Sequence, residues 1–304
     1  MTGALWATAA GLGFGLFQSL NRRAVREMDV FLVTFLQLLV SSVVLSVLTI
    51  LTIDLSILLA APSRALVNFS LAGLVHFFAG WTFLNASQKR VGAARTSPLI
   101  GTTPLFGAAL AAITLREFPT LISWAAIVLM ILGIYLISDH SQRPVGKREA
   151  SIKAFFIRSG IRDSFFGLAT AMSWATSPIF IRLGLEEIPS PLLGVTVGMV
   201  TCMFAYSVPL FLRRKRVLKT PRLRGDVYTV LIAGLILGLA TWARWVGLEL
   251  TKVATVLSLS LLSIPVVMVL SPILYGQTME RITIPLVLGA GLIMGGALLL
   301  IYVG

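Results

Sequence analysis

The chain has 304 residues, of which 57% are hydrophobic and only 12% are charged, and its formal net charge is +13. A soluble domain carries charge on about a quarter of its residues, so this composition argues against a soluble fold and favours a membrane protein. The lysines and arginines lie almost entirely in short connections between apolar runs, where they suit lipid headgroups, and we therefore expect no nucleic-acid partner.

The apolar runs have the length of membrane-spanning helices. In chain order they cover residues 3–20, 30–53, 65–87, 92–115, 121–138, 161–183, 190–212, 227–250, 253–275 and 283–303. A helix of about 20 apolar residues spans the hydrocarbon core of a bilayer. These runs are too long for barrel strands and lack the alternation of such strands. We therefore predict an all-α membrane protein with ten transmembrane helices.

Two connections are longer and strongly basic, at residues 139–160 and 213–225. The first of them separates the predicted domains, which are a five-helix repeat at 1–138 and a second one at 161–304. The first helix has no basic segment before it, so we interpret it as a retained helix and not as a signal peptide.

An internal repeat relates the two halves. When the chain is shifted by 162 residues, Ala7-Thr8-Ala9 falls on Ala169-Thr170-Ala171, and Gly133 falls on Gly295. Five is an odd number of crossings, so the second half must enter the membrane in the opposite orientation. Two inverted five-helix repeats are a common architecture of secondary transporters, with the binding site at the repeat interface and alternating access to it.

Two corresponding segments carry a resemblance to a known family. They are WTFLNASQKRVGAARTSPLIGTTPLFGAALAAITLREFPT (81–120) and RWVGLELTKVATVLSLSLLSIPVVMVLSPILYGQTMERIT (244–283). Each has a helix end, a basic residue, valine, small residues, a proline-bearing helix and a glutamate before the last helix of its half. The chain resembles the drug/metabolite transporter superfamily, specifically its ten-helix EamA-type transporters. The resemblance implies a cavity lined by helices one to four of each half, with the fifth and tenth helices peripheral.

Charge sets the expected orientation. Most basic residues follow the first, third, fifth, seventh and ninth predicted helices, whereas the opposite side holds only Arg64, Arg116, Arg182 and Lys252. The positive-inside rule therefore places both termini outside the cytoplasm. The resemblance implies the reverse, because members of the family more often have both termini inside.

Arg244 is the first candidate for binding substrate. It lies in the eighth predicted helix between Trp242 and Trp245. A guanidinium can hold a carboxylate or phosphate through two hydrogen bonds, and an indole can stack on an organic group. The alternative is an arginine that extends to the membrane surface from a position near its helix end.

His76 is the second candidate, near the middle of the third predicted helix. Ionisable groups at membrane depth are costly and are candidates for function by default. His76 could hydrogen-bond substrate or take a proton near neutral pH. The alternative is a core histidine bonded to a backbone carbonyl.

Uncharged polar and aromatic residues complete the predicted binding site, namely Gln18, Gln37, Trp81 and Thr103. The polar residues belong to stripes on the first, second and fourth helices. Such stripes also serve helix packing, and a tryptophan can equally belong to an interfacial belt.

The sequence has no HExxH motif and no pair of aspartates at membrane depth, and its single cysteine, Cys202, lies inside an apolar run. We therefore expect no enzyme activity, no cofactor and no metal site.

The leading hypothesis is a multi-pass secondary transporter of the plasma or inner cell membrane. Its expected substrate is a small organic metabolite, and the best candidate is an amino acid or a related amphipathic or anionic solute. One alternative is a multidrug or cation exporter, although the first helix lacks the carboxylate that such chemistry needs. Another is a non-transporting membrane scaffold or lipid scramblase, against which the inverted repeat argues. The expected partners are the solute and the bilayer, and a homodimer is left open.

Overall fold

A computed structural model describes residues 1–54, 56–91, 96, 99–140, 161–212, 227–275 and 284–303. These residues form helices and short connections, and none of them forms a strand. Residues 141–160 and 213–226, which hold nearly all of the two basic connections, lie outside the described residues.

The helices of the first half are α1 (Thr2–Glu27), α2 (Val30–Thr52), α3 (Ser56–Leu59), α4 (Ser63–Gly73), the π-helix η1 (Leu74–Ala79), α5 (Gly80–Val91), α7 (Thr103–Thr114) and α8 (Leu121–His140). Those of the second half are α10 (Ile161–Glu187), α11 (Pro191–Leu212), α13 (Val227–Leu250), α14 (Val253–Leu259), the 3-10 helix η2 (Ser260–Leu262), α15 (Ser263–Tyr275) and α16 (Ile284–Val303). Each of the ten predicted ranges contains helix. The third consists of α4, η1 and α5 in succession, and the ninth of α14, η2 and α15.

Among the described residues, six helical stretches are long and apolar enough to cross a membrane, judged by length and composition. They are Phe31–Thr52, Ser63–Ser87, Ser164–Glu187, Pro191–Leu212, Val227–Leu250 and Val253–Leu270. Leu99–Thr114, Leu121–Ile137 and Val287–Tyr302 are shorter apolar helices. The first predicted span lies inside α1, which is in neither group. The predicted multi-pass membrane protein is confirmed, and the count of ten crossings stays a prediction.

Local signals in the sequence explain where helices begin. Asp29 precedes α2, and its carboxylate accepts hydrogen bonds from the backbone N–H groups of Phe31 at 2.9 Å and Leu32 at 3.3 Å. These are donors that the first turn of a helix leaves unpaired. Pro191 occupies the first position of α11, where its missing N–H costs no hydrogen bond.

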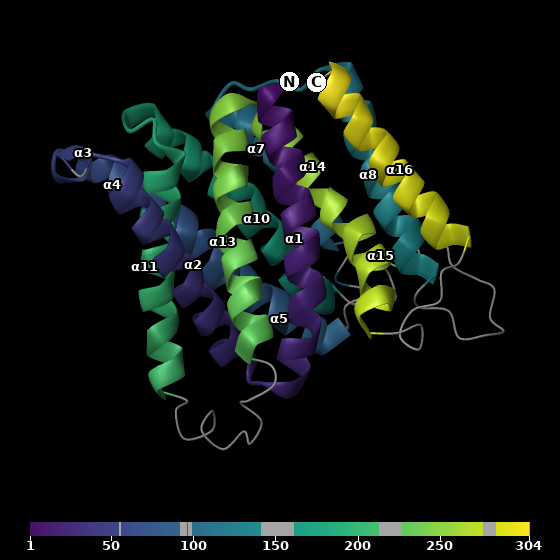
Figure 1. Ribbon diagram of the computed structural model, residues 1–304. Helices are drawn as coiled ribbons and strands as arrows, with labels where there is room; N and C mark the ends of the chain where they lie inside the picture. The colour runs from purple at the N-terminus through teal and green to yellow at the C-terminus, as the bar shows by residue number, and fades with distance from the viewer. Residues whose placement is uncertain are drawn as a thin grey trace.

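Most helices pack against helices of the other half. α1 packs against α13 and against α14, η2 and α15, while α10 packs against α4, η1 and α5 and against α7. α10 is the counterpart of α1 in the repeat, so exchanging the halves reproduces this packing. α8 packs along its own counterpart α16 at one edge of the bundle, and both termini lie at the same end (Figure 1). The elements that line the centre therefore come from both halves.

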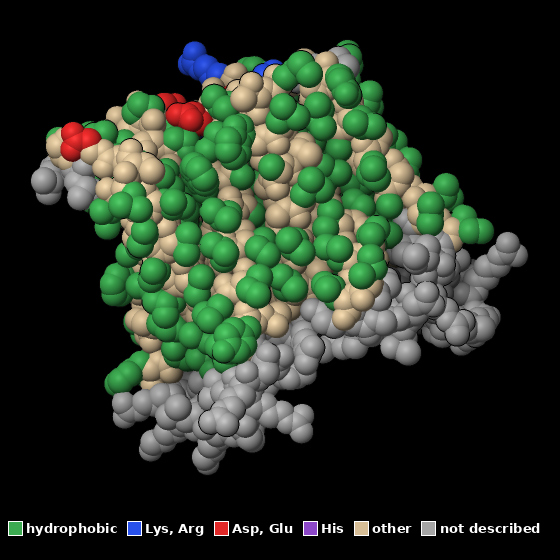
Figure 2. All heavy atoms as spheres, viewed as in Figure 1, with side chains coloured by type: hydrophobic (Ala, Val, Ile, Leu, Met, Phe, Trp, Pro, Cys, Tyr) green, Lys and Arg blue, Asp and Glu red, His purple; other side chains and the backbone are tan. Residues whose placement is uncertain are grey.

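The outer surface of the described residues is largely apolar on the face shown in Figure 2. Green hydrophobic side chains cover the visible face, and charged ones gather along its upper edge (Figure 2). Large side chains such as Leu16, Val47, Phe204 and Leu298 are exposed. A surface of this kind would cause aggregation in water, whereas lipid accommodates it.

Two helices of opposite halves approach closely at glycines. Gly73 ends α4, and a Cβ atom built on it would overlap the backbone carbonyl of Gly198 in α11. Glycine allows backbones to approach within a distance that any side chain would prevent, which is a common device of membrane helices. This crossing lies immediately before η1 and so helps to place His76.

Candidate functional site at Arg244 and His76

Arg244 of α13 points into the interior of the bundle. Only 3% of the residue is exposed. Its Nη1 lies 3.1 Å from both Nδ1 and Nε2 of His76 in η1, 168 residues away in the chain. An arginine that reaches the membrane surface would expose its guanidinium, so the burial of Arg244 argues against that alternative. The structure thus brings the two predicted ionisable residues together from opposite halves.

His76 is held in place by Trp174 of α10. The imidazole and the indole are stacked, with ring centroids 5.6 Å apart and an interplanar angle of 24°. Trp174 Nε1 also donates a hydrogen bond to the backbone carbonyl of His76 at 3.1 Å. Gly80 leaves room for the indole, because a Cβ there would lie 2.5 Å from Trp174 Nε1. Trp174 therefore lies directly beside the site.

Side chains from neighbouring helices support the π-helix that carries His76. Ser177 of α10 donates to the carbonyl of Ala72 at 3.2 Å, and Tyr206 of α11 donates to that of Phe77 at 3.3 Å. A π-helix departs from the regular hydrogen-bond ladder, and in lipid its backbone groups need partners inside the protein. Irregular turns of this kind are frequent at functional sites.

Two nitrogens of Arg244 have no partner in the part of the chain that the structure describes. Nε and Nη2 are buried, and neither makes a hydrogen bond to any described residue. They lie on one edge of the planar guanidinium, and Nη1, which contacts His76, lies on the other side. A buried donor without an acceptor is costly, and more so when it is charged. The free edge has the geometry that accepts a carboxylate through two parallel hydrogen bonds.

The carboxylate of Glu117 is engaged elsewhere. Arg182 Nη2 donates to Glu117 Oε1 at 2.7 Å, and the Val253 backbone N–H donates to Oε2 at 2.8 Å. Arg182 Nη1 also donates to the carbonyls of Leu248 at 2.7 Å and Glu249 at 3.1 Å. This cluster joins the α7–α8 connection to α10 and to the start of α14. It leaves neither oxygen of Glu117 to neutralise Arg244.

The two tryptophans that flank Arg244 face different neighbours. Trp245 is buried against Phe69 of α4, with ring centroids 5.6 Å apart. Trp242 is half-buried and packs against Trp6 of α1, with ring centroids 6.0 Å apart. Both therefore fix α13 against the first half, and a contact of either with substrate stays a prediction.

Trp81 is connected to His76 through other rings. Its indole stacks on Phe17 of α1, with ring centroids 5.9 Å apart, and meets the edge of Phe77, with ring centroids 5.6 Å apart. The ring centroid of Phe77 in turn lies 4.6 Å from that of His76. Gln18, the next residue of α1, is exposed. Two residues along a helix turn a side chain by about 200°, so Gln18 points away from the lipid-facing Leu16. The rings of Phe17, Trp81 and Phe77 thus connect α1 with His76.

Gln37 and Thr103 lie apart from this group. Gln37 of α2 is buried, and its Nε2 donates to Asn21 Oδ1 of α1 at 2.9 Å, while its Oε1 has no partner among the described residues. Thr103 Oγ1 donates to the carbonyl of Ile100 at 2.6 Å. No hydrogen bond between described residues joins either side chain to Arg244 or His76, so their predicted roles stay predictions.

Sequence reasoning did not select Trp174 or Asn21. Signals for both were present. Trp174 lies on the same helical face as Thr170 and Ser177, at spacings of four and three residues, and Asn21 follows Gln18 by three residues on α1.

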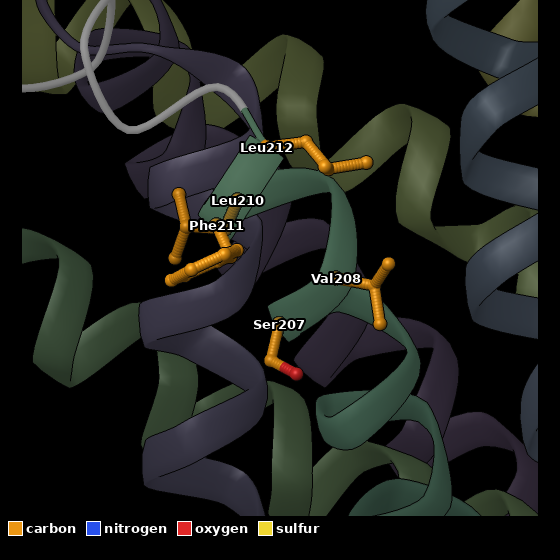
Figure 3. Close-up of a pocket in the computed structure, with 5 residues that line it drawn as sticks. All are labelled: Ser207, Val208, Leu210, Phe211 and Leu212. Atoms are coloured by element: carbon orange, nitrogen blue, oxygen red, sulfur yellow. The ribbon is translucent and has the colours of Figure 1, made fainter.

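A surface pocket of about 540 Å³ lies at the C-terminal end of α11 (Figure 3). It is lined by Ser207, Val208, Leu210, Phe211 and Leu212, all from that single helix. Four of these five side chains are apolar, and Val208, Phe211 and Leu212 are exposed on the lipid-facing surface. None of the described residues that line the pocket is charged, and none of them belongs to the candidate site.

The chain was compared with known proteins and solved structures. No curated protein matches the chain. A solved structure described only as "Crystal structure of protein" superposes with a TM-score of 0.71 at 16% identity and covers 96% of this chain and 95% of that one. This likeness concerns the fold alone. The model of the EamA-like transporter family matches residues 1–139 and 163–302, one stretch over each predicted half. The chain therefore belongs to the EamA-like transporter family, as the two resembling segments predicted.

Proposed function

We propose that this protein is a secondary transporter for a small organic anion or amphipathic metabolite, with an amino acid as the best candidate. It has ten transmembrane helices in two inverted five-helix repeats and works by alternating access at the interface of the repeats. One observation carries the proposal. Arg244 presents a buried guanidinium edge, Nε and Nη2, without a partner among the described residues, where α13 of one half meets η1 of the other.

The chemistry of this edge selects the substrate class. A carboxylate fits two parallel N–H donors, and in a low-dielectric interior such a charge-assisted pair is stronger than a neutral hydrogen bond. Nη1 is meanwhile held by His76 at 3.1 Å, which fixes the direction of the free edge. A bound carboxylate would supply the charge partner that the described residues do not.

A cation exporter fits this site less well. The charge buried between the halves is positive, and no described acidic group contacts it. A cationic drug bound beside Arg244 would be repelled by the guanidinium, because two like charges interact strongly where water is excluded.

Binding in detergent tests the substrate class. We expect an α-carboxylate solute to raise the melting temperature of the purified protein in a panel of the twenty common L-amino acids, AMP and glucose 6-phosphate. A ligand at a hundred times its Kd stabilises the folded state by about 2.7 kcal/mol. Choline is the cationic control and should give no shift. Stabilisation by choline without stabilisation by any anion would contradict the proposal.

Labelling of single cysteines tests the orientation. We expect Ser151→Cys and Thr220→Cys, placed in the two basic connections of a Cys202→Ala background, to resist an impermeant thiol reagent in intact cells. The positive-inside rule puts these connections in the cytoplasm. Thr2→Cys is the matched control, because Thr2 is exposed at the end that carries both termini (Figure 1). Labelling of the connections but not of Thr2→Cys in intact cells would show that the termini are cytoplasmic.

A further inference from the structure

We propose that His76 is the proton-coupling residue of this transporter and takes up one proton when an anion binds to Arg244. The proposal rests on the proposed function and adds the coupled ion to it. Its basis is the contact of Arg244 Nη1 with both ring nitrogens of His76 at 3.1 Å, inside the bundle.

In the unloaded site His76 is neutral. A neutral imidazole has one nitrogen that can accept a hydrogen bond from Nη1, whereas a doubly protonated ring has two donors and no acceptor. A second positive charge beside a buried guanidinium would also be strongly repelled. The observed contact therefore belongs to a site that carries a single positive charge, that of Arg244.

The groups around His76 leave Arg244 in control of its protonation. Trp174 faces the imidazole ring from α10, and its indole does not titrate near neutral pH. From α11, Tyr206 donates its hydroxyl to the carbonyl of Phe77 at 3.3 Å, and Cys202 is a buried thiol near the backbone of Phe78. Within the described part of the chain, Arg244 is the charged group that acts on His76.

An anion on the free edge of Arg244 reverses this balance. Its negative charge offsets that of the guanidinium, so His76 can accept a proton from water. For a monoanionic solute, the carboxylate and the proton together add no net charge to the site. An amino acid also brings its ammonium group, so its transport with one proton moves one positive charge. Because linkage is reciprocal, protonation of His76 must also tighten anion binding. Anion and proton then move together, and a proton gradient drives the anion.

Binding as a function of pH tests the inference. The probes are the twenty common L-amino acids, tried singly at pH 5.5, 6.5 and 7.5, a range in which the α-carboxyl group stays ionised and an ordinary histidine titrates. We expect the apparent Kd of the wild type to fall by up to about tenfold per pH unit as the pH decreases, the limit for one linked proton. In His76→Gln, whose amide oxygen still accepts from Nη1, the Kd should not vary with pH.

His140→Gln is the matched control, because His140 is the other histidine of the sequence. It should keep the pH dependence of the wild type. His76→Asn replaces His76→Gln if the latter is not folded by its melting transition. Binding that is independent of pH in the wild type, or pH-dependent binding that survives both His76 variants, would overturn the proton-coupling role while leaving the anion site intact. Failure of every amino acid to bind would instead contradict the choice of an amino acid as the substrate.

Transport gives a second readout. In proteoliposomes that contain a pH-sensitive dye, addition of the bound amino acid should acidify the lumen with the wild type and with His140→Gln. The His76→Gln variant should bind the amino acid without moving protons. Acidification by His76→Gln at the wild-type rate would refute the proposal.

Discussion

Arg244→Ala is expected to remove binding of the anionic substrate while leaving the protein folded. Removing one member of a buried, hydrogen-bonded charge pair costs about 2–5 kcal/mol, which corresponds to a loss of affinity of roughly 30-fold or more. The side chain has two buried donors without partners in the described structure, so folding loses little when it is removed. We expect an unchanged or higher melting temperature in detergent, together with loss of the substrate-induced shift.

Arg244→Lys separates geometry from charge. Lysine keeps the positive charge but not the planar pair of donors, so a site that binds carboxylate through Nε and Nη2 should lose much of its affinity. Melting curves and uptake into proteoliposomes should be measured for both variants. Full activity of the lysine variant would reduce Arg244 to a generic positive charge. Full activity of both variants would remove Arg244 from the binding site.

Gly73→Ala is expected to lower the stability of the protein more than an ordinary glycine-to-alanine change. The new Cβ would overlap the carbonyl of Gly198, so α4 and α11 must move apart. Forcing extra atoms into a packed interior typically costs about 1–3 kcal/mol. The melting temperature should fall, and substrate affinity should fall with it, because η1 and His76 follow Gly73 directly.

Gly291→Ala in α16 is the matched control. No atom lies within 4 Å of a Cβ built on Gly291, and the residue is exposed. Alanine is favoured over glycine in a helix by about 0.5–1 kcal/mol, so this variant should be as stable as the wild type or more stable. Equal melting temperatures for the two variants would show that the α4–α11 crossing tolerates a methyl group.

Much of the architecture could be predicted because lipid imposes a simple rule. A membrane-spanning segment must satisfy its own backbone hydrogen bonds, so a run of about 20 apolar residues has few alternatives to a helix. Each predicted range accordingly contains helix, from 3–20 in α1 to 283–303 in α16. The family followed from the two corresponding segments at 81–120 and 244–283, and the family match confirmed it.

The pairing of Arg244 with His76 could not be predicted in this way. The repeat relates His76 to Gly238 and Arg244 to Thr82, so the shift that aligns the halves gives no signal for either residue. The two side chains meet because both reach into the interior between the halves, although α13 itself packs mainly against α1 and α2. The π-helical turn was equally unexpected, since the residues of Leu74–Ala79 contain neither proline nor a glycine run.

The sequence by itself determined the membrane class, the helical segments, the two related halves and the family, because each of these follows from the length, spacing and recurrence of residue types along the chain. The tertiary structure decided which polar groups are buried together. It placed Trp174 against His76, engaged Glu117 with Arg182 and left one edge of Arg244 without a hydrogen-bond partner among the described residues. Such contacts depend on how helices from opposite halves rotate and cross, which is set by side-chain packing between segments distant in the chain.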